Sequence, residues 1–313
     1  MKIRSCALVL LAVTLFLCFS GCMPRLREES SLNEEAEKTE DTADQASEEM
    51  TEENLILPGE KGSFSFTAMS LNVRRYYAED TGVLSVEERK KPLSDYFRKI
   101  SSDVILLQEA PREWYAPLMD TLSDLYFFSA DLPNIILVKK ERFSICQEGA
   151  FYLSETPEKK SVGWDAKNER SCQWVLLENA ENGARLFVYN THLDHVGVKA
   201  RMESAKMIAE NLKTLEYPYL LGGDLNCKEE SYPYNTLCEV LLDCRKEAAE
   251  TDSGSTYHGW GSISDEKGYQ IDFLFACPIN VKINTFHILR DRWGEGNFYS
   301  DHYAVRSEME ILY

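Results

Sequence analysis

The chain has 313 residues, of which 34 are Lys or Arg and 52 are Asp or Glu, so its formal net charge at pH 7 is −18. This length suits one large α/β domain with additional N-terminal sequence. An acidic chain is a poor partner for a long nucleic-acid duplex, because phosphate contacts need clustered Lys and Arg, although a local basic rim can sit on an acidic protein.

Residues 1–22 have the pattern of a secretory signal. Lys2 and Arg4 precede a run of thirteen apolar or small residues, Ala7 to Phe19, and a membrane-spanning helix needs about 20. The next segment, Phe19-Ser20-Gly21-Cys22, resembles a bacterial lipobox. The resemblance implies lipidation of Cys22 and an extracytoplasmic lipoprotein held at the cell membrane of a bacterium. The alternatives are an ordinary signal peptide with a chance cysteine, and a retained apolar helix.

Residues 23–54 are expected to be a disordered linker. They contain twelve Asp or Glu and three Lys or Arg, a net charge of −9. Such a segment cannot bury enough apolar surface to fold, so we expect it to stay extended, as a tether between the membrane and the folded domain. The remaining residues, 55–313, carry a net charge of −11 and form the predicted folded domain.

The domain contains six cysteines and no CxxC pair or zinc-like spacing. An exported protein can form disulfides. We nevertheless favour free, buried thiols for Cys146, Cys172, Cys227, Cys238, Cys244 and Cys277.

Short apolar runs rich in Val, Ile, Phe and Tyr predict buried strands in the domain. In chain order they are Phe64–Val73, Val104–Leu107, Ile135–Val138, Trp174–Leu177, Leu186–Tyr189, Tyr219–Leu221, Ile271–Phe275 and Tyr303–Val305. Helical spacing of apolar residues occurs over Val86–Ile100, Lys199–Leu215 and Tyr234–Leu242. Strands interleaved with helices predict an α/β fold with mixed sheets covered by helices.

Polar motifs lie at the ends of six of these strands. Each motif alone is common, since a Gly-Asp-x-Asn segment, for example, is a typical turn. Loops at strand ends converge on a rigid sheet edge, which is where functional groups often gather. The motifs are Ser-Leu-Asn72-Val, Leu-Gln-Glu109, Asn-Thr-His192-Leu, Gly-Asp224-Leu-Asn226, Ile-Asp272-Phe and Ser-Asp301-His302.

The six motifs, in this order, resemble the endonuclease/exonuclease/phosphatase superfamily. The resemblance covers about Phe64 to Val305, so residues 55–313 would be the catalytic domain. It implies a four-layered sandwich like that of deoxyribonuclease I, in which two mixed β-sheets pack face to face between helices. It also implies a hydrolase that cleaves phosphodiesters or phosphomonoesters, with the active site at one end of both sheets.

The resemblance implies that Glu109 and Asn72 ligate Mg²⁺ or Mn²⁺, with Asp301 as a further carboxylate near the metal. Hard cations prefer oxygen ligands, and Mg²⁺ keeps several waters when only one or two carboxylates bind it. Open positions would remain for a phosphate oxygen of the substrate.

The resemblance also assigns the catalytic groups. Asp224 would orient and deprotonate a water that attacks phosphorus in line, while Asn226 and His192 hold phosphoryl oxygens. His302 would donate to the same oxygens or act as an acid or base, oriented by Asp272. The division of labour among Asp224, His192 and His302 stays open.

A zinc site is the competing interpretation. His192, Asp194 and His195 lie close in sequence, and imidazole and carboxylate groups suit zinc. Such a site needs another histidine cluster, whereas His258 and His287 are isolated in the sequence.

Five residues outside the motifs are candidates for binding the substrate. Arg74 belongs, with its neighbour Arg75, to a basic rim, and Arg170 has the geometry to clamp a phosphate or to form a surface ion pair. Trp164, Tyr257 and His258 are expected either to form an aromatic wall for a sugar or base, or to pack their own loops.

We expect a monomer that acts on a small or short phosphoester, such as a phosphorylated sugar, a lipid headgroup, a nucleotide or a short oligonucleotide. The sequence contains no run of Lys and Arg with interleaved aromatic residues, the pattern that would indicate binding of a long nucleic-acid strand. The alternatives are an extracellular nuclease of the same fold and a membrane-tethered binding module without catalysis.

Overall fold

The computed structural model describes residues 62–129 and 133–313. The predicted signal, Cys22 and the acidic linker 23–54 lie outside the described residues. No helix within the described residues is both long enough and apolar enough to cross a membrane. The six cysteines of the described part are all free, and four are buried as expected, but Cys146 is exposed and Cys238 is only partly buried.

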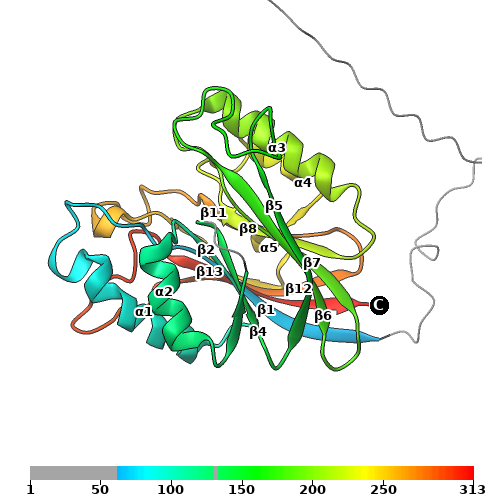
Figure 1. The fold of residues 1–313 in the computed structure, drawn as a ribbon, viewed down its shortest axis with the longest axis horizontal. Coiled ribbons are helices and arrows are strands. Elements are labelled where there is room, and N and C mark those ends of the chain that lie inside the picture. The colour runs from blue at the N-terminus through cyan, green and yellow to red at the C-terminus, as the bar shows by residue number, and fades with distance from the viewer. Residues whose placement is uncertain (1–61, 130–132) are drawn as a thin grey trace, which may run out of the picture. The chain divides into compact units, whose positions relative to one another are not determined.

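Two mixed sheets form the centre of the described chain (Figure 1). The first has the order β10-β12-β13-β1-β2-β4-β3, and the second has the order β5-β6-β7-β8-β11-β9. The first comprises β1 (Ser63–Asn72), β2 (Val104–Gln108), β3 (Tyr126–Phe128), β4 (Ile135–Lys139), β10 (Glu250–Thr251), β12 (Val281–Leu289) and β13 (Ala304–Leu312). The second comprises β5 (Phe143–Tyr152), β6 (Ser171–Asn179), β7 (Arg185–His192), β8 (Tyr219–Asp224), β9 (Leu242–Asp243) and β11 (Asp272–Ala276).

Helices cover the outer face of each sheet. Apolar side chains from both sheets, such as Phe66 and Val188, form a common buried layer between them. The outer face of the first sheet packs against α1 (Val86–Ile100) and α2 (Arg112–Leu122). The outer face of the second packs against α3 (Val198–Leu212) and α4 (Tyr232–Cys238). The predicted four-layered sandwich is therefore confirmed.

The bounds of α1 are those that the sequence predicts. The hydroxyl of Ser85 caps the helix by accepting from the Glu88 backbone N–H at 3.4 Å. Glu87 and Glu88 lie in the first turn, and basic residues lie in the last turn, so side-chain charges oppose the helix dipole at both ends.

The other helices differ from the prediction. The helix predicted over Lys199–Leu215 is α3, which begins at Val198 and already ends at Leu212. The sequence pattern does not predict α2, which contains Pro117; packing of Trp114, Leu118 and Leu122 at helical spacing holds it on the sheet. The helix expected at Tyr234–Leu242 is α4, which begins at Tyr232 and ends at Cys238, because Leu242 already belongs to strand β9. A short helix, α5 (Cys244–Glu247), follows.

Gly223, the next-to-last residue of strand β8, lets β8 run close to β7 and places Asp224 at the end of the strand. Its φ is +147°, and an added Cβ would overlap the carbonyl oxygen of Thr191 on β7. We expect Gly223→Ala to lower the free energy of unfolding by roughly 2 kcal/mol or more, because the strain combines with a forced backbone shift. Urea unfolding would measure this.

Gly183→Ala is the matched control. Gly183 has a φ of +74°, but a Cβ there meets nothing within 4 Å. The expected cost is about 1 kcal/mol, from the left-handed conformation alone. Equal losses in the two variants would contradict the role given to the close approach at Gly223.

Candidate active site

Three strand ends of the second sheet place their polar residues in one row. In the parallel pair β7 and β8, His192 lies opposite Asp224. In the antiparallel pair β8 and β11, Asp224 lies opposite Asp272. All three side chains are at most 4% exposed. The sheet register thus fixes a buried row of one imidazole and two carboxylates.

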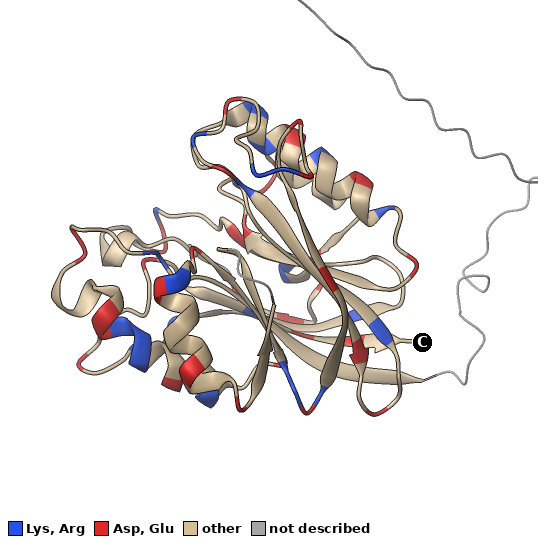
Figure 2. Ribbon diagram, in the orientation of Figure 1, with Lys and Arg blue, Asp and Glu red and all other residues tan. Residues whose placement is uncertain are grey.

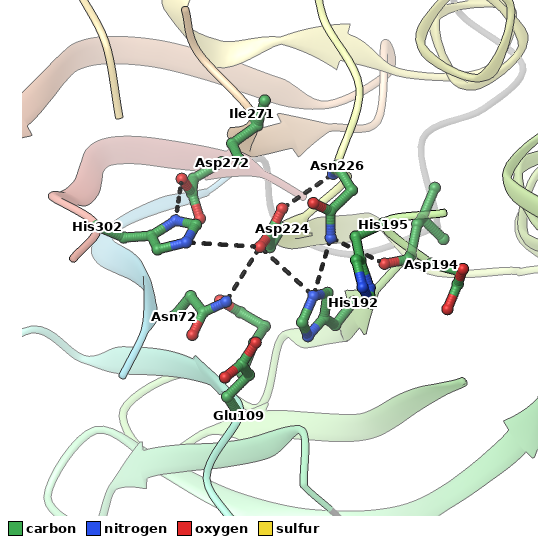
Figure 3. A network of polar contacts seen from close by, with 12 residues as sticks. Asn72, Glu109, His192, Asp194, His195, Asp224, Asn226, Ile271, Asp272 and His302 are labelled. Atoms are coloured by element: carbon green, nitrogen blue, oxygen red, sulfur yellow. Dashed lines mark hydrogen bonds and ion pairs between the residues drawn. The ribbon is translucent and has the colours of Figure 1, made fainter. Parts of the chain in front are cut away.

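Asp224 is at the centre of the contacts in Figure 3. Its Oδ2 accepts from Asn72 Nδ2 at 3.0 Å and lies 3.4 Å from His192 Nε2 and 3.9 Å from His302 Nε2. Its Oδ1 accepts from the Asn226 backbone N–H at 2.9 Å. Burial, together with the carboxylate charge on β11, raises the pKa of Asp224 to about 7. Asp224 can therefore exchange a proton near neutral pH.

His302, two residues before β13, forms a dyad with Asp272. Its Nδ1 lies 2.9 Å from Asp272 Oδ2, and both side chains are buried. Burial alone would lower the pKa of His302, but attraction to Asp272 and a hydrogen bond from the ring outweigh it and raise the pKa to about 10. The ring is therefore a charged donor at neutral pH, with Nε2 toward Asp224.

His192 is held in the opposite protonation state. The amide Nδ2 of Asn226 donates to the Leu193 carbonyl at 3.0 Å and also lies 3.0 Å from His192 Nε2. Because that amide group only donates, Nε2 accepts and the ring hydrogen is on Nδ1. Burial, followed by the positive charge of Arg170, holds the pKa of His192 well below its usual value. The two histidines of the site thus differ in charge.

The predicted metal ligands lie at strand ends of the first sheet, and Asn72 is joined to Asp224 of the second sheet by a hydrogen bond. Glu109 directly follows β2 with a φ of +53°, and its Oε2 accepts from the Arg75 backbone N–H at 3.1 Å. Asn72 Oδ1 accepts from the Arg74 backbone N–H at 2.9 Å. Asp301 is 3% exposed, and burial raises the pKa of its carboxyl. The donors are all oxygens, which fits Mg²⁺ or Mn²⁺ rather than a thiophilic metal.

A second group of possible ligands lies deeper. Within the described residues, Asp224, Asp272 and His302 offer donor atoms within 4.8 Å of one another. Asp272 Oδ1 is buried and has no hydrogen-bond partner. The position of the dyad makes these groups more suited to proton handling than to holding an ion.

The site opens into a cleft of about 620 Å³. Of the five predicted substrate residues, Arg74, Arg170 and Tyr257 line it, and Trp164 and His258 do not. The His258 ring is buried, with its centroid 4.3 Å from that of Phe298 and 4.1 Å from that of Tyr303. Only Tyr257 of the predicted aromatic wall therefore reaches the cleft.

Arg74 lies in the cleft wall but is already paired. Its Nε donates to Asp80 at 2.7 Å and its Nη1 donates to Asp301 at 2.9 Å. Its guanidinium lies 4.3 Å from the centre of the Tyr77 ring. The exposed neighbour Arg75 supplies the basic rim that the sequence assigns to both residues.

Sequence reasoning missed several cleft residues. Tyr269 lies three residues before Asp272, so proximity to a motif was the available signal, and His195, three residues after His192, was predicted only as part of a zinc site. No sequence signal marks Asn134, which directly precedes β4 and is brought to the cleft only by the tertiary fold. Its Nδ2 donates to the Ser171 carbonyl at 2.9 Å.

The structure does not assemble the zinc site considered above. Asp194 directs both carboxylate oxygens to backbone N–H groups and to Arg170. His195 Nδ1 lies 3.2 Å from Arg170 Nη2. These groups are occupied by each other, so the segment does not form a metal site with His192.

Comparison with known proteins places this site in a family. The model of the endonuclease/exonuclease/phosphatase family matches residues 69–302. No curated protein matches the chain significantly. A solved family protein from Bacteroides thetaiotaomicron is 25% identical, with a TM-score of 0.75, covering 80% of this chain and 99% of its own. A mannosyl-6-phosphatase from the same organism is also 25% identical, with a TM-score of 0.72 and coverages of 78% and 99%.

D. rerio TDP2, solved with a single-strand DNA product, shares the fold. It is 15% identical, with a TM-score of 0.61, and the match covers 78% of this chain and 98% of that one. The family match spans most of the described residues and includes every one of the six motifs. The chain therefore belongs to the endonuclease/exonuclease/phosphatase family, a family of hydrolytic phosphoesterases.

Proposed function

We propose that the protein is a divalent-metal-dependent phosphoesterase that hydrolyses a small phosphoester, with a phosphorylated sugar as the favoured substrate. The observation that carries the proposal is the position of Asp224, which contacts Asn72, His192 and His302 in the lining of the cleft. A mannosyl-6-phosphatase among the structural relatives supports a sugar phosphate.

The protonation states of the site residues indicate their roles in hydrolysis. Asp224, with a pKa of about 7, takes the proton of the attacking water. The charged ring of His302 donates to phosphoryl oxygens as negative charge builds there. The amide of Asn226 donates to His192 Nε2 and to the Leu193 carbonyl, so its role is to orient the neutral His192 ring. Mg²⁺ or Mn²⁺, held by Glu109 and Asn72, would supply polarisation of a phosphoryl oxygen.

The size and charge of the surroundings support a small substrate. A cleft of about 620 Å³ is typical of small-molecule sites. Figure 2 shows Lys and Arg interspersed with Asp and Glu on the helices of both outer layers. A long nucleic acid would favour clustered positive charge instead.

An activity screen with metal removal tests the proposal. We expect hydrolysis of p-nitrophenyl phosphate or mannose 6-phosphate with Mg²⁺ or Mn²⁺, loss of activity with EDTA, and recovery when the metal is restored. Bis-p-nitrophenyl phosphate, nucleotides and oligonucleotides belong in the same screen, and preferred cleavage of oligonucleotides would support the nuclease alternative. No turnover of any ester, with metal binding shown by calorimetry, would support a binding module.

We also propose that lipidated Cys22 anchors the enzyme outside the cell. The support is the signal pattern of residues 1–22 and the lipobox-like segment that ends at Cys22. Cys22→Ser is expected to move the protein from the membrane fraction to the soluble fraction, because the acyl chains are lost. Continued membrane binding of the variant would identify the uncleaved run at residues 7–19 as the anchor.

A further inference from the structure

One wall of the cleft carries a cation that no catalytic motif contains. Arg170 immediately precedes β6, whose pairing with β7 brings Cys172 opposite Thr191. Arg170 therefore lies beside the end of β7, next to His192, which is the last residue of that strand. Its side chain is 13% exposed and lines the cleft.

We propose that Arg170, held in place by Asp194 and His195, makes phosphomonoesters better substrates than phosphodiesters. The inference rests on the proposed phosphoesterase function and names the class of ester that the site prefers.

Asp194 fixes the position of Arg170. The Asp194 carboxylate is 1% exposed and accepts from the backbone N–H groups of Lys167, Asn168, Val196 and Gly197 at 2.8–3.1 Å. Those bonds outweigh burial and hold the pKa of Asp194 well below its usual range. Arg170 Nε donates to its Oδ2 at 3.3 Å.

His195 fixes the other end of the guanidinium. Arg170 Nη2 lies 3.2 Å from His195 Nδ1. An arginine only donates, so Nδ1 accepts, and the neutral ring carries its hydrogen on Nε2. Nη1 and one hydrogen of Nη2 remain for a ligand, and these form the edge that binds two oxygens of a phosphate side by side.

Arg170 is the best placed of the cleft cations in the described part of the chain. Arg74 is paired with two carboxylates, Asp80 and Asp301, whereas Arg170 is paired with one, Asp194. Arg75 and Lys167 are exposed, so solvent screens their charges. A half-buried guanidinium with free N–H groups beside His192 is therefore the group most able to recognise additional charge on the reacting phosphate.

The two ester classes differ in what they offer this guanidinium. A monoester near neutral pH carries a charge of about −1.5 to −2 and three terminal oxygens. A diester carries one charge, and an ester group replaces one terminal oxygen. That ester oxygen is a poor acceptor. A diester keeps two terminal oxygens, and because the metal and His302 would take at least one of them, at most one is left for the two N–H donors of Arg170, so one donor lacks a partner in a partly desolvated wall.

A matched pair of substrates tests the inference. p-Nitrophenyl phosphate and methyl p-nitrophenyl phosphate share a leaving group and differ by one methyl on phosphate. We expect the wild type to have the higher kcat/KM for the monoester. Arg170→Gln is expected to lower that value about 10- to 100-fold, and the diester value by a factor at least about threefold smaller, because only the monoester offers charged oxygens to both N–H donors of the fork.

Two variants accompany it. Arg170→Lys keeps the charge without the fork and is expected to lose an intermediate part of the preference; it also keeps the test valid if Arg170→Gln does not fold. Lys167→Gln removes a charge from the same wall at an exposed position, and its ratio of monoester to diester kcat/KM should equal that of the wild type.

The outcomes separate this inference from the proposed function. Equal losses for both esters in Arg170→Gln, or a wild type that prefers the diester, would overturn the role of Arg170 and leave the phosphoesterase proposal standing. If the metal-loaded wild type hydrolyses neither ester nor any other substrate of the screen, both fail together.

Discussion

Replacing His302 with glutamine is expected to lower kcat for phosphoester hydrolysis by about 10²-fold or more. The ring is buried, its Nδ1 is held by Asp272 at 2.9 Å, and its pKa is raised to about 10, so the wild-type enzyme keeps a charged donor beside Asp224. Glutamine can replace the hydrogen bond to Asp272 but not the charge. Steady-state kinetics on the best substrate, with circular dichroism as a check of folding, would measure the loss.

The pH profile of Asp272→Asn separates charge from geometry. In the wild type, His302 stays charged until the pH rises through about 10. Without the Asp272 carboxylate the pKa of His302 falls, because burial opposes the charged ring and only the charges of Asp301 and Asp224 still favour it. The alkaline limb of kcat should therefore move from near pH 10 to lower pH. An unmoved alkaline limb in Asp272→Asn would contradict the charged-donor role.

The strand-end motifs could be predicted because each is local in sequence. An apolar run that ends in Asn72, Glu109 or Asp224 marks both the strand and the polar group at its end. Pairing then brings the ends together, as when β8 sets Asp224 between His192 on β7 and Asp272 on β11. Local sequence does not contain that register, so the ordered set of motifs was needed to infer it.

The partners of charged residues could not be predicted in the same way. Arg74 follows Asn72 by two residues and looks like a free cation, yet it pairs with Asp301, 227 residues away. His258 and Trp164 have the chemistry of a binding wall, but the fold buries the first against Phe298 and leaves the second outside the cleft lining. Long-range packing decides such cases, and composition does not reveal it.

Arg89 on α1 is the clearest group of this kind. Arginine is rarely buried without a carboxylate partner, but this side chain is 0% exposed. It donates to the carbonyls of Val73 at 2.7 Å, Arg74 at 3.1 Å and Tyr299 at 2.9 Å. These carbonyls belong to the segments that follow Asn72 and precede Asp301. Arg89 therefore joins two loops of the active site from behind.

Its burial is unusual because no carboxylate among the described residues forms an ion pair with it. A fourth carbonyl, of Leu84, accepts from its Nε at 2.7 Å, and the rings of Trp114 and Trp260 lie 5.0 and 5.1 Å from the guanidinium. Burial lowers its pKa to about 10. Backbone dipoles and aromatic faces replace a counterion, so each of these contacts depends on the guanidinium being present.

Arg89→Met is therefore expected to lower the free energy of unfolding by about 3–5 kcal/mol, since it leaves four carbonyl acceptors without their donor. Urea unfolding would measure this loss. Any folded fraction should also need more Mg²⁺ for half-maximal activity, because the loops around Asn72 and Asp301 are no longer held in place. Lys91→Met, at an exposed position on the same helix, should change stability by less than about 0.5 kcal/mol. Arg89→Lys should fall between, because an ammonium has three N–H donors for four carbonyls. A loss below about 1 kcal/mol in Arg89→Met would show that water satisfies these carbonyls and that the two loops are positioned by other contacts.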